Sequence, residues 1–427
     1  MHEAACHHWS TKCPIQKYFR CLNLSGIISP MKVFITEAAR TPFGSYFGSL
    51  SAIRPDDLLG ATIKELVKKV SSLDPQEIDD VIMGDSNGAG EDNRNVARMS
   101  ALLAGLPETV PGVTVNRLCG SGAEAVIQAS RAVKTGDAKF VIAGGVEAMS
   151  RAPWIVRRTG KKLPESVSVE ELNQSTVGWR MINPLFPNEW TASLGRCAEK
   201  VAERLGISRE SQDQWALRSH QRALAAWEQG YHDGFVFPFG GLHRDESIRP
   251  DTSLEKLSTL GSAFSESGAV TAGNSSPMND GAVAMLLTDE EGLQELDIDK
   301  KNSGAFGEIL GSQVVARSPD EFTLAPVDAI RKLMHRLSLS FDDVKIWEIN
   351  EAFASMVLTV LHELPEIDLE KVNVNGGAIA IGHPVGGSAA RVIADTSREL
   401  RRRGGGIGIA AACIGVGLGV AIAIKVP

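Results

Sequence analysis

Short β-rich runs alternate with amphipathic helical runs in two separate parts of this chain, and that alternation limits the folds open to it. Such an order is typical of a parallel or mixed sheet with helices on both faces, so we expect an α/β fold. The first part predicts strands at 31–37, 80–84, 113–116 and 140–145, with helices at 56–70 and up to 135. The second part predicts helices at 325–336, from 351 and at 388–402, with strands at 346–349, 372–375 and 406–412.

The two parts repeat the same order of elements. Val-Thr-Val-Asn at 113–116 and Val-Asn-Val-Asn at 372–375 each precede a glycine-rich segment, a small-residue helix and an apolar strand. We therefore expect two similar α/β domains that face each other.

A stretch of different character separates the two parts. Between 150 and 268 the charges, prolines and tryptophans increase and strand signals become sparse. One helix is expected at 209–229, N-capped by Ser208 and ended by Gly230. We interpret this stretch as an inserted, mostly helical region over the sheet domains. The expected domains are 31–149 with 277–300 (N-terminal), 150–276 (inserted loop domain) and 301–427 (C-terminal).

Charge and cysteine content exclude several classes of protein. The net charge is −8 over 427 residues and the two signs are mixed, so the basic stripe that nucleic acids require is missing. Six cysteines in so long a chain indicate free thiols in a reducing compartment. The uncharged segment 404–424 is long enough for a membrane span, but its glycines favour two buried strands joined by a turn. Neither nucleic acid nor membrane is expected as a partner.

The first thirty residues show no helical or strand period. We expect a disordered extension there, and we favour Met31 as the true start. A mitochondrial presequence stays open as an alternative, since the segment contains a single acidic residue. A zinc site is the other alternative, although the spacing of its ligands matches no standard metal template. Those ligands would be Cys6, His7, His8, Cys13 and Cys21.

Cys119 is the candidate nucleophile. It lies in Asn-Arg-Leu-Cys-Gly-Ser-Gly (116–122), between a predicted strand and a predicted helix. A helix N-terminus favours the thiolate, and free N–H groups there can stabilise an oxyanion. On this feature alone, a small buried cysteine without a chemical role is an equal alternative.

His383 lies in a glycine-rich loop (375–384) just before a predicted helix. Packing explains a histidine there poorly, and a cysteine nucleophile needs a nearby imidazole or a depressed pKa. We therefore interpret His383 as the base for Cys119, with a turn histidine as the alternative.

Two further residues occupy turns that suit chemistry. Cys413 begins the tight turn Cys-Ile-Gly-Val-Gly (413–417), which fits either a second acid/base thiol or a packed core cysteine. Asn350 begins Asn-Glu-Ala-Phe (350–353) at a strand-to-helix junction, where it could hold a water, polarise a carbonyl or be an ordinary N-cap.

Together these motifs resemble those of the thiolases, the acetyl-CoA C-acyltransferases, from Met31 to the C-terminus. The remaining matching segments are Gly-Gly-Val-Glu-Ala-Met-Ser (144–150) and Thr-Ala-Gly-Asn-Ser-Ser (271–276) with Asn-Asp-Gly-Ala (279–282). Any one motif would be weak, but six in order form a specific signal. The resemblance implies a thiolase-like fold, in which the two α/β domains pack as a layered αβαβα core. The inserted domain would hold CoA and cover the acyl pocket.

The resemblance also implies roles for the site residues. Cys119 would attack an acyl-CoA thioester and become acylated, and His383 would take its proton. Cys413 would remove or return a proton on the α-carbon of acetyl-CoA. One oxyanion hole would comprise His383 and a water held by Asn350, and the backbone N–H groups of Cys119 and Gly415 would form the other. Chemistry of this kind needs a nucleophile, a base and two oxyanion sites, but no metal or redox cofactor.

Substrate and setting follow from the same resemblance. Ser276 would contact the pantetheine arm of CoA, and CoA and acyl-CoA would be substrates. The expected function is cleavage of 3-oxoacyl-CoA or the reverse condensation, in fatty-acid β-oxidation, by a cytoplasmic homodimer or homotetramer. An alternative is a 3-oxoadipyl-CoA thiolase of aromatic degradation, which Val416 and the segments 149–153 and 178–180 resemble. The segment 387–391 departs from the commoner family pattern and leaves the substrate preference open. A ketoacyl synthase and a non-catalytic CoA-binding homologue fit the motifs less well.

Overall fold

The computed structural model describes residues 31–158, 160, 168–296 and 304–427. The expected extension at 1–30, with its alternative zinc site and presequence, lies outside the described residues. The described chain forms one mixed sheet of ten strands and a separate two-stranded hairpin. Nine strands follow the order β10-β11-β12-β9-β1-β8-β5-β3-β4, and β2 (Gly44–Ser45) pairs with β8 off this path.

The sheet has an N-terminal half and a C-terminal half. They join where β1 pairs with β9, through Phe34 with Glu308 and Ile35 with Gly307. The N-terminal half contains β1 (Phe34–Arg40), β8 (Asn279–Thr288), β5 (Phe140–Ala148), β3 (Ile78–Gly84) and β4 (Gly112–Val115). The C-terminal half contains β9 (Gly307–Ala316), β12 (Leu418–Val426), β11 (Gly406–Ile414) and β10 (Val344–Ile349).

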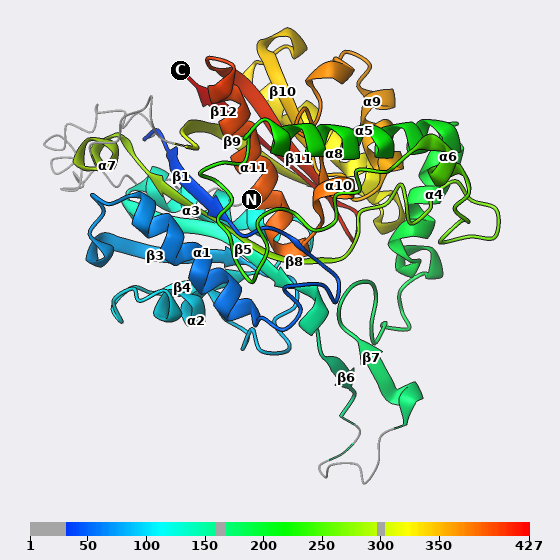
Figure 1. The fold of residues 1–427 in the computed structure, drawn as a ribbon, viewed down its shortest axis with the longest axis horizontal. Coiled ribbons are helices and arrows are strands. Elements are labelled where there is room, and N and C mark those ends of the chain that lie inside the picture. Colours follow the sequence, from blue (N-terminus) through cyan, green and yellow to red (C-terminus); the bar gives the residue numbers. More distant parts are fainter. Residues whose placement is uncertain (1–30, 159, 161–167, 297–303) are drawn as a thin grey trace, which may run out of the picture.

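Helices cover the outer faces of both halves and fill the space between them (Figure 1). In the middle layer, α3 (Ser121–Thr135) packs on the N-terminal half, while α11 (Val385–Arg402) packs on α3 and on both halves. The outer layers are α1 (Pro55–Lys69) with α2 (Val96–Leu103), and α8 (Ala325–Leu337) with α9 (Ala354–Glu363). The expected αβαβα layering is confirmed.

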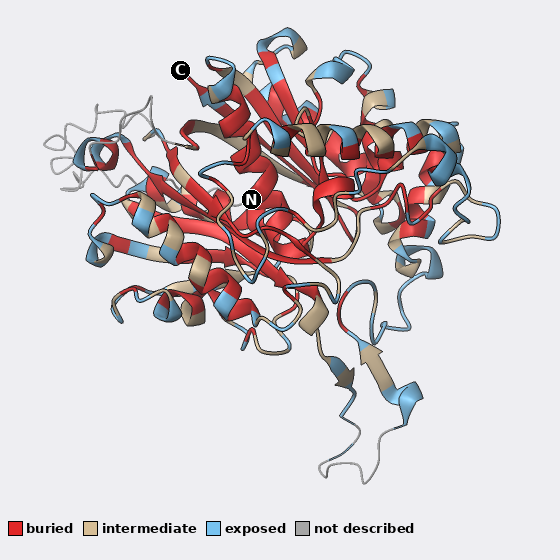
Figure 2. Cartoon of the chain, in the orientation of Figure 1, coloured by how far each residue is buried: buried red, intermediate tan, exposed pale blue. Residues whose placement is uncertain are grey.

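The N-terminal ends of the two middle helices touch. A Cβ at Gly122 would lie 2.8 Å from the carbonyl oxygen of Gly386 and 2.9 Å from the backbone nitrogen of Ala390. Glycine in α3 therefore allows a backbone approach that any side chain would block. Residues 385–400 of α11 are buried on all sides (Figure 2). This contact brings together the turns that precede α3 and α11.

The inserted stretch runs from β5 to β8. Its regular structure is chiefly helical, and the long segments between the helices are irregular. As expected, Ser208 caps the longest helix, by accepting from the Ser211 N–H, and Gly230 with φ +70° follows its end. A hairpin projects from the body at the lower right of Figure 1. These elements are α4 (Leu194–Arg204), α5 (Arg209–Glu228), α6 (Leu254–Ser258), β6 (Trp154–Val156) and β7 (Leu172–Gln174).

The strand expected at 372–375 is wrong. Only Val372 forms a β-bridge, with Trp347. Asn373 has φ +46°, and its side chain bonds both the N–H and the carbonyl of Ile349 at 2.8 Å. A side-chain amide thus takes the hydrogen bonds that a neighbouring strand would have made. The repeated Val-x-Val-Asn pattern therefore marks a strand in the first part only.

Other boundaries differ by a few residues. The first strand begins at Phe34, and α11 begins at Val385 because the histidine loop ends earlier than expected. The 404–424 segment forms antiparallel β11 and β12, as expected. Two short helices, α7 (Glu290–Glu295) and α10 (Ala378–Ile381), complete the set. Among the described residues, no helix is both long and apolar enough to cross a membrane.

Candidate active site

Cys119 lies in the turn between β4 and α3, at the contact between the two middle helices. Leu118 has φ +48°, a left-handed conformation that branched side chains disfavour. A Cβ at Gly120 would lie 2.3 Å from Cδ1 of Ile414, so glycine is required for the two cysteine-bearing turns to pack together. Cys119 therefore lies beside the turn that contains Cys413.

Cys413 is buried near the end of β11. The backbone N–H groups of Gly415 and of Cys119 itself face the Cys119 sulfur, where both lower its pKa. Burial, and after it the charge of Cys119, raise the pKa of Cys413 well above its ordinary value. Two thiols and two backbone donors thus form one cluster, built from both halves of the fold.

The resting form of Cys119 is the thiol. Burial raises the pKa of Cys119 to about 11 and outweighs the two N–H groups. The backbone N–H groups at the helix end thus favour the thiolate, as expected, but in the free protein burial outweighs them. The sulfur needs a base at the moment it attacks.

His383 is fixed through its backbone and through one ring nitrogen. Its N–H donates to Oδ1 of Asn279 at 2.8 Å, and Gly382 before it has φ +113°. On the ring, Nδ1 lies 2.7 Å from Oγ of Ser388, whose hydroxyl donates to the carbonyl of Pro384 at 2.8 Å. Because the hydroxyl proton is already used, Nδ1–H donates to Ser388 and Nε2 carries the lone pair.

Nε2 of His383 is buried and has no partner within the described part of the chain. Burial, and after it the nearby Arg391 cation, lower the pKa of His383 to about 4. The ring is therefore neutral near pH 7, and its free nitrogen can accept a proton. A neutral imidazole and a neutral thiol form the pair that proton transfer from Cys119 requires.

Asn350 supplies a second unpaired polar group. It is fully buried at the end of β10, and its N–H donates to the carbonyl of Ala411 at 2.9 Å. Neither Oδ1 nor Nδ2 of its side chain has a hydrogen-bond partner among the described residues. A buried amide without partners is costly unless a water or a ligand pairs with it. The side chain is thus suited to hold a water.

A short segment connects the Asn350 turn with His383. The N–H and the hydroxyl of Ser276 each donate to the carbonyl of Ala352 at 3.0 Å. Two residues further on, Met278 forms a parallel bridge with His383. The segment 276–278 therefore links the turn that follows Asn350 with the loop that contains His383.

Glu351 positions this turn, a role that its sequence motif did not predict. Its carboxylate accepts from Trp215 Nε1 at 3.0 Å, Ser219 Oγ at 2.6 Å and Asn373 Nδ2 at 2.9 Å. Since Trp215 and Ser219 belong to α5, the buried carboxylate ties the inserted region to the Asn350 turn. The position of Glu351, directly after Asn350 in the sequence, is the feature that could have indicated this role.

Glu147 supports the histidine loop from the other side. It accepts from the N–H of Ser86 at 3.1 Å and from the N–H of Gly386, the second residue of α11, at 2.9 Å. Its charge also raises the pKa of Cys119, although by less than burial does. Glu147 therefore connects the loop after β3 with both catalytic candidates.

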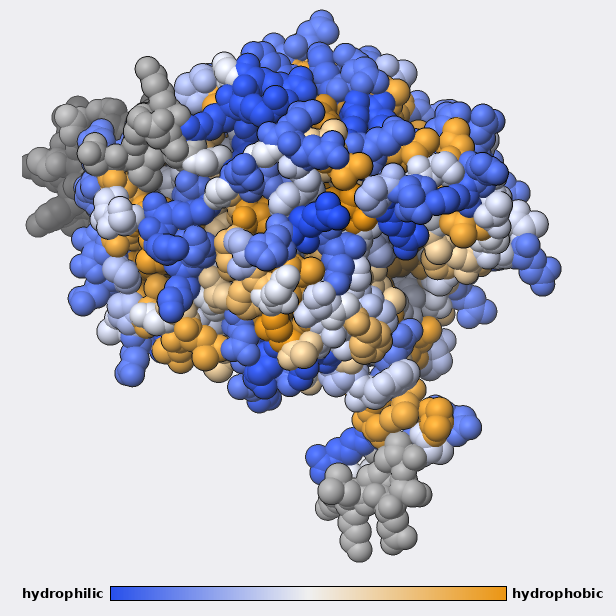
Figure 3. All heavy atoms as spheres, in the orientation of Figure 1, coloured by the Kyte–Doolittle hydropathy of each residue, from blue (hydrophilic) through white to orange (hydrophobic). Residues whose placement is uncertain are grey.

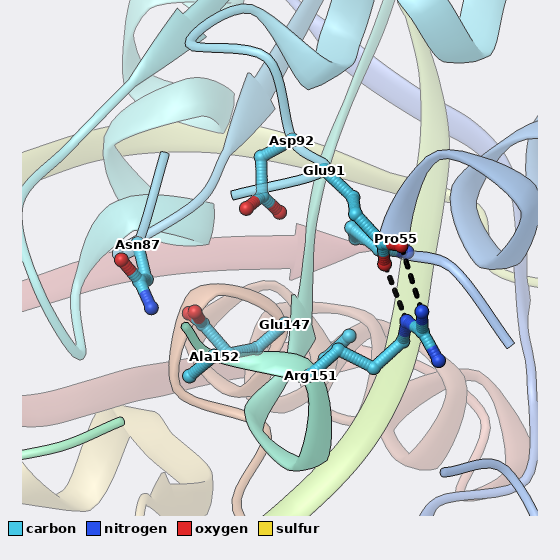
Figure 4. Close-up of a pocket in the computed structure, with 8 residues that line it drawn as sticks. Pro55, Asn87, Glu91, Asp92, Glu147, Arg151 and Ala152 are labelled. Atoms are coloured by element: carbon cyan, nitrogen blue, oxygen red, sulfur yellow. Dashed lines mark hydrogen bonds and ion pairs between the residues drawn. The ribbon is translucent and has the colours of Figure 1, made fainter. Parts of the chain in front are cut away.

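A polar cavity adjoins Glu147 (Figure 4). Burial raises the pKa of Glu147 to about 7 and that of Asp92 to about 6. A cluster of carboxyls does not suit anionic CoA, and no group of His, Cys, Asp or Glu in the described ranges is arranged to hold a metal ion. We interpret the cluster as support for the site. The cavity is lined by Pro55, Asn87, Glu91, Asp92, Glu147, Ala148, Arg151 and Ala152.

Two family models match most of the chain. The model described as "Thiolase, N-terminal domain" matches residues 33–291, and "Thiolase, C-terminal domain" matches residues 304–426. The two matches cover both halves of the sheet and the inserted stretch.

Individual proteins agree with the family models. The "3-oxoadipyl-CoA/3-oxo-5,6-dehydrosuberyl-CoA thiolase" of Escherichia coli (strain K12) is 44% identical over 386 residues, which cover 88% of this chain and 94% of that protein. The crystal structure of Bacillus anthracis acetyl-CoA acetyltransferase superimposes with a TM-score of 0.84 at 37% identity, covering 93% and 99% of the two chains. Human mitochondrial 3-ketoacyl-CoA thiolase in complex with CoA gives 0.84 at 36%, covering 93% and 98%.

Proposed function

Since the chain belongs to the thiolase family, we propose that Cys119, His383 and Cys413 carry out its reaction. The protein is an acyltransferase that acts on CoA thioesters, by thiolytic cleavage of a 3-oxoacyl-CoA or by the reverse condensation. The observation that carries the residue assignment is the unpaired, buried Nε2 of His383, whose loop leads into α11 where that helix meets α3, the helix that follows Cys119.

Cleavage begins when Nε2 of His383 takes the thiol proton of Cys119 and the sulfur attacks the 3-oxo carbonyl. The bond between C2 and C3 of the substrate then breaks. The acyl group stays on Cys119, and the electron pair leaves on C2 as the enolate of acetyl-CoA, which Cys413 protonates. The Cys413 thiolate next takes the proton of incoming CoA, whose sulfur displaces the acyl group, and His383 returns its proton to Cys119.

Negative charge develops on two oxygens during this sequence, and each needs donors. The N–H groups of Cys119 and Gly415 face the attacking sulfur, so they would bind the oxygen of the carbonyl under attack. The unpaired amide of Asn350 would hold a water that, with His383, binds the enolate oxygen.

We further propose that CoA and acyl-CoA enter as substrates and that the reaction uses no metal or redox cofactor. Two thiols, one imidazole and two donor sites supply every proton transfer and charge that the steps require. Ser276, beside the Asn350 turn, would contact the pantetheine arm of CoA. Full activity after exhaustive treatment with a chelator is expected, and loss that added metal restores would contradict it.

The preferred substrate we propose is 3-oxoadipyl-CoA, which would place the enzyme in aromatic degradation rather than fatty-acid β-oxidation. The E. coli relative bears that substrate in its name. Segments 149–153 and 178–180 of this chain, and Val416, resemble the same subgroup.

We also propose a cytoplasmic homodimer or homotetramer. Large apolar side chains that a monomer would leave in water are consistent with assembly, because contiguous apolar surface marks interaction sites. Leu103 of α2 is 55% exposed, Val113 of the edge strand β4 is 41% exposed, and Trp154 of the projecting hairpin is 66% exposed. Figure 3 shows apolar atoms gathered at the base of that hairpin. Light scattering after size exclusion would contradict assembly if the mass were that of one chain.

The experiment that tests the proposal is thiolysis with free CoA, followed by loss of the 3-oxoacyl-CoA enolate absorbance. A higher kcat/KM for 3-oxoadipyl-CoA than for acetoacetyl-CoA is the expected result. The reverse preference would contradict the substrate assignment alone. Undiminished cleavage by Cys119→Ala would contradict the residue assignment.

A further inference from the structure

Val416 has a backbone conformation that its own side chain disfavours. It lies in the turn between β11 and β12 with φ +61°. For a β-branched residue this left-handed conformation is a genuine outlier, whereas glycine adopts it without steric cost. Such strain persists where the surrounding structure or function requires the residue.

Packing does not explain the valine. Its side chain is 36% exposed and belongs to none of the apolar cores formed by the described residues. The turn itself would form equally well with glycine at this position. We therefore expect the Val416 side chain to act on a molecule that binds at the exposed side of the turn.

That turn belongs to the reactive cluster. Gly415, directly before Val416, presents its N–H to the Cys119 sulfur. A Cβ at Gly415 would lie 3.5 Å from Leu118 Cδ1 and 3.5 Å from Leu194 Cδ2. Leu118 and Leu194 thus form an apolar wall around Gly415, and Val416 is the next residue along this turn.

We propose that Val416 narrows the acyl site beside Cys413 and selects 3-oxoacyl-CoA substrates that carry no branch at C2. This inference rests on the proposed roles of Cys119 and Cys413. The thiol of Cys413 must reach C2 to transfer its proton, so a substituent on C2 lies against the turn that contains Val416. Admitting or excluding one methyl group in an apolar site changes kcat/KM by roughly 10–200-fold.

The test compares thiolysis of acetoacetyl-CoA with that of 2-methylacetoacetyl-CoA, which differs by one methyl group at C2. The wild type should prefer the unbranched substrate, and Val416→Gly should reduce that preference by about tenfold or more. Val416→Ala keeps the left-handed strain but loses two methyl groups, so an intermediate preference is expected. A preference unchanged in both variants would overturn the inference.

Ser338→Gly is the matched control. Ser338 ends α8, on the outer layer, with φ +54°. Glycine there should relieve comparable strain and raise Tm without changing substrate preference. A change of preference equal to that of Val416→Gly would overturn the inference, because relief of strain would then explain both. A wild type that cleaves neither of these substrates nor 3-oxoadipyl-CoA, with Cys119 reduced, would instead contradict the proposed function and the inference together.

Discussion

At the scale of single residues, the reactivity of the site depends on the protonation states of His383 and Cys119 before substrate binds. The His383–Ser388–Pro384 chain of hydrogen bonds leaves the lone pair on Nε2. The sequence predicted His383 as a base but not this support. Ser388 lies one turn into the next helix, and serine there has no signal that separates it from a packing residue.

Ser388→Ala should slow acylation of Cys119. Without the hydroxyl, His383 loses the acceptor that fixes its tautomer, and we expect kcat to fall by roughly 10–100-fold, the range known for partners that orient a metal-bound imidazole. Ser397→Ala is the control, since Ser397 is equally buried in α11 but donates to the carbonyl of Phe306. Equal loss of kcat in both variants would show a structural role only. The test is to measure kcat by steady-state kinetics, and Tm by thermal unfolding, for both variants.

Alkylation of Cys119 should keep rising with pH. Burial holds the pKa of this thiol at about 11, so the thiolate fraction increases throughout the range from pH 6 to pH 9. The rate of iodoacetamide modification, followed by mass spectrometry of the Cys119 peptide, provides the measurement. A plateau below pH 8 would indicate a thiolate–imidazolium pair and contradict the neutral resting state.

At the scale of elements, two turns and two helix ends build the site, and sequence patterns predicted them unevenly. Strands and helices with clear periods were predicted within a few residues. The 372–375 segment was not, because its valines suit a strand while Asn373 instead caps Ile349 with its side chain. A pattern of residue types within one segment cannot show that a side chain will hydrogen-bond to the backbone of a distant segment.

Asp85, in the loop after β3, makes the free energy of unfolding depend on pH. Burial raises the pKa of Asp85 well above its ordinary value, and Oδ2 of this carboxyl has no partner among the described residues. A carboxyl whose pKa is higher in the folded state stabilises the fold at low pH, and that contribution is lost as pH rises through the folded value. Asp85→Asn should therefore raise Tm more at pH 8 than at pH 5.

Thermal unfolding of Asp85→Asn at the two pH values tests this dependence. Asp57→Asn, which alters an exposed carboxyl of α1, is the control. An identical shift of Tm at pH 5 and pH 8 for Asp85→Asn would mean that the carboxyl is ionised alike in both states of the protein.

At the scale of the whole molecule, each half of the sheet contributes one thiol. Cys119 follows β4 of the N-terminal half, and Cys413 belongs to β11 of the C-terminal half. The repeated order of elements predicted two facing domains. It did not predict that β1 and β9 would join them into a single sheet, because a pairing of two residues leaves no pattern in the sequence. The sequence also could not predict the pKa values of Cys119, His383 and Cys413, because burial between the two halves determines them.

The most direct test of this account separates the two thiols. Cys413→Ala, incubated with acetyl-CoA, should still gain one acetyl group on Cys119 by intact-mass analysis. The same variant should cleave 3-oxoacyl-CoA roughly 10²–10⁴-fold more slowly, the usual effect of removing a positioned acid or base. Full turnover by Cys413→Ala, or failure of Cys119 to become acetylated in a folded variant, would contradict the division of labour between the two halves.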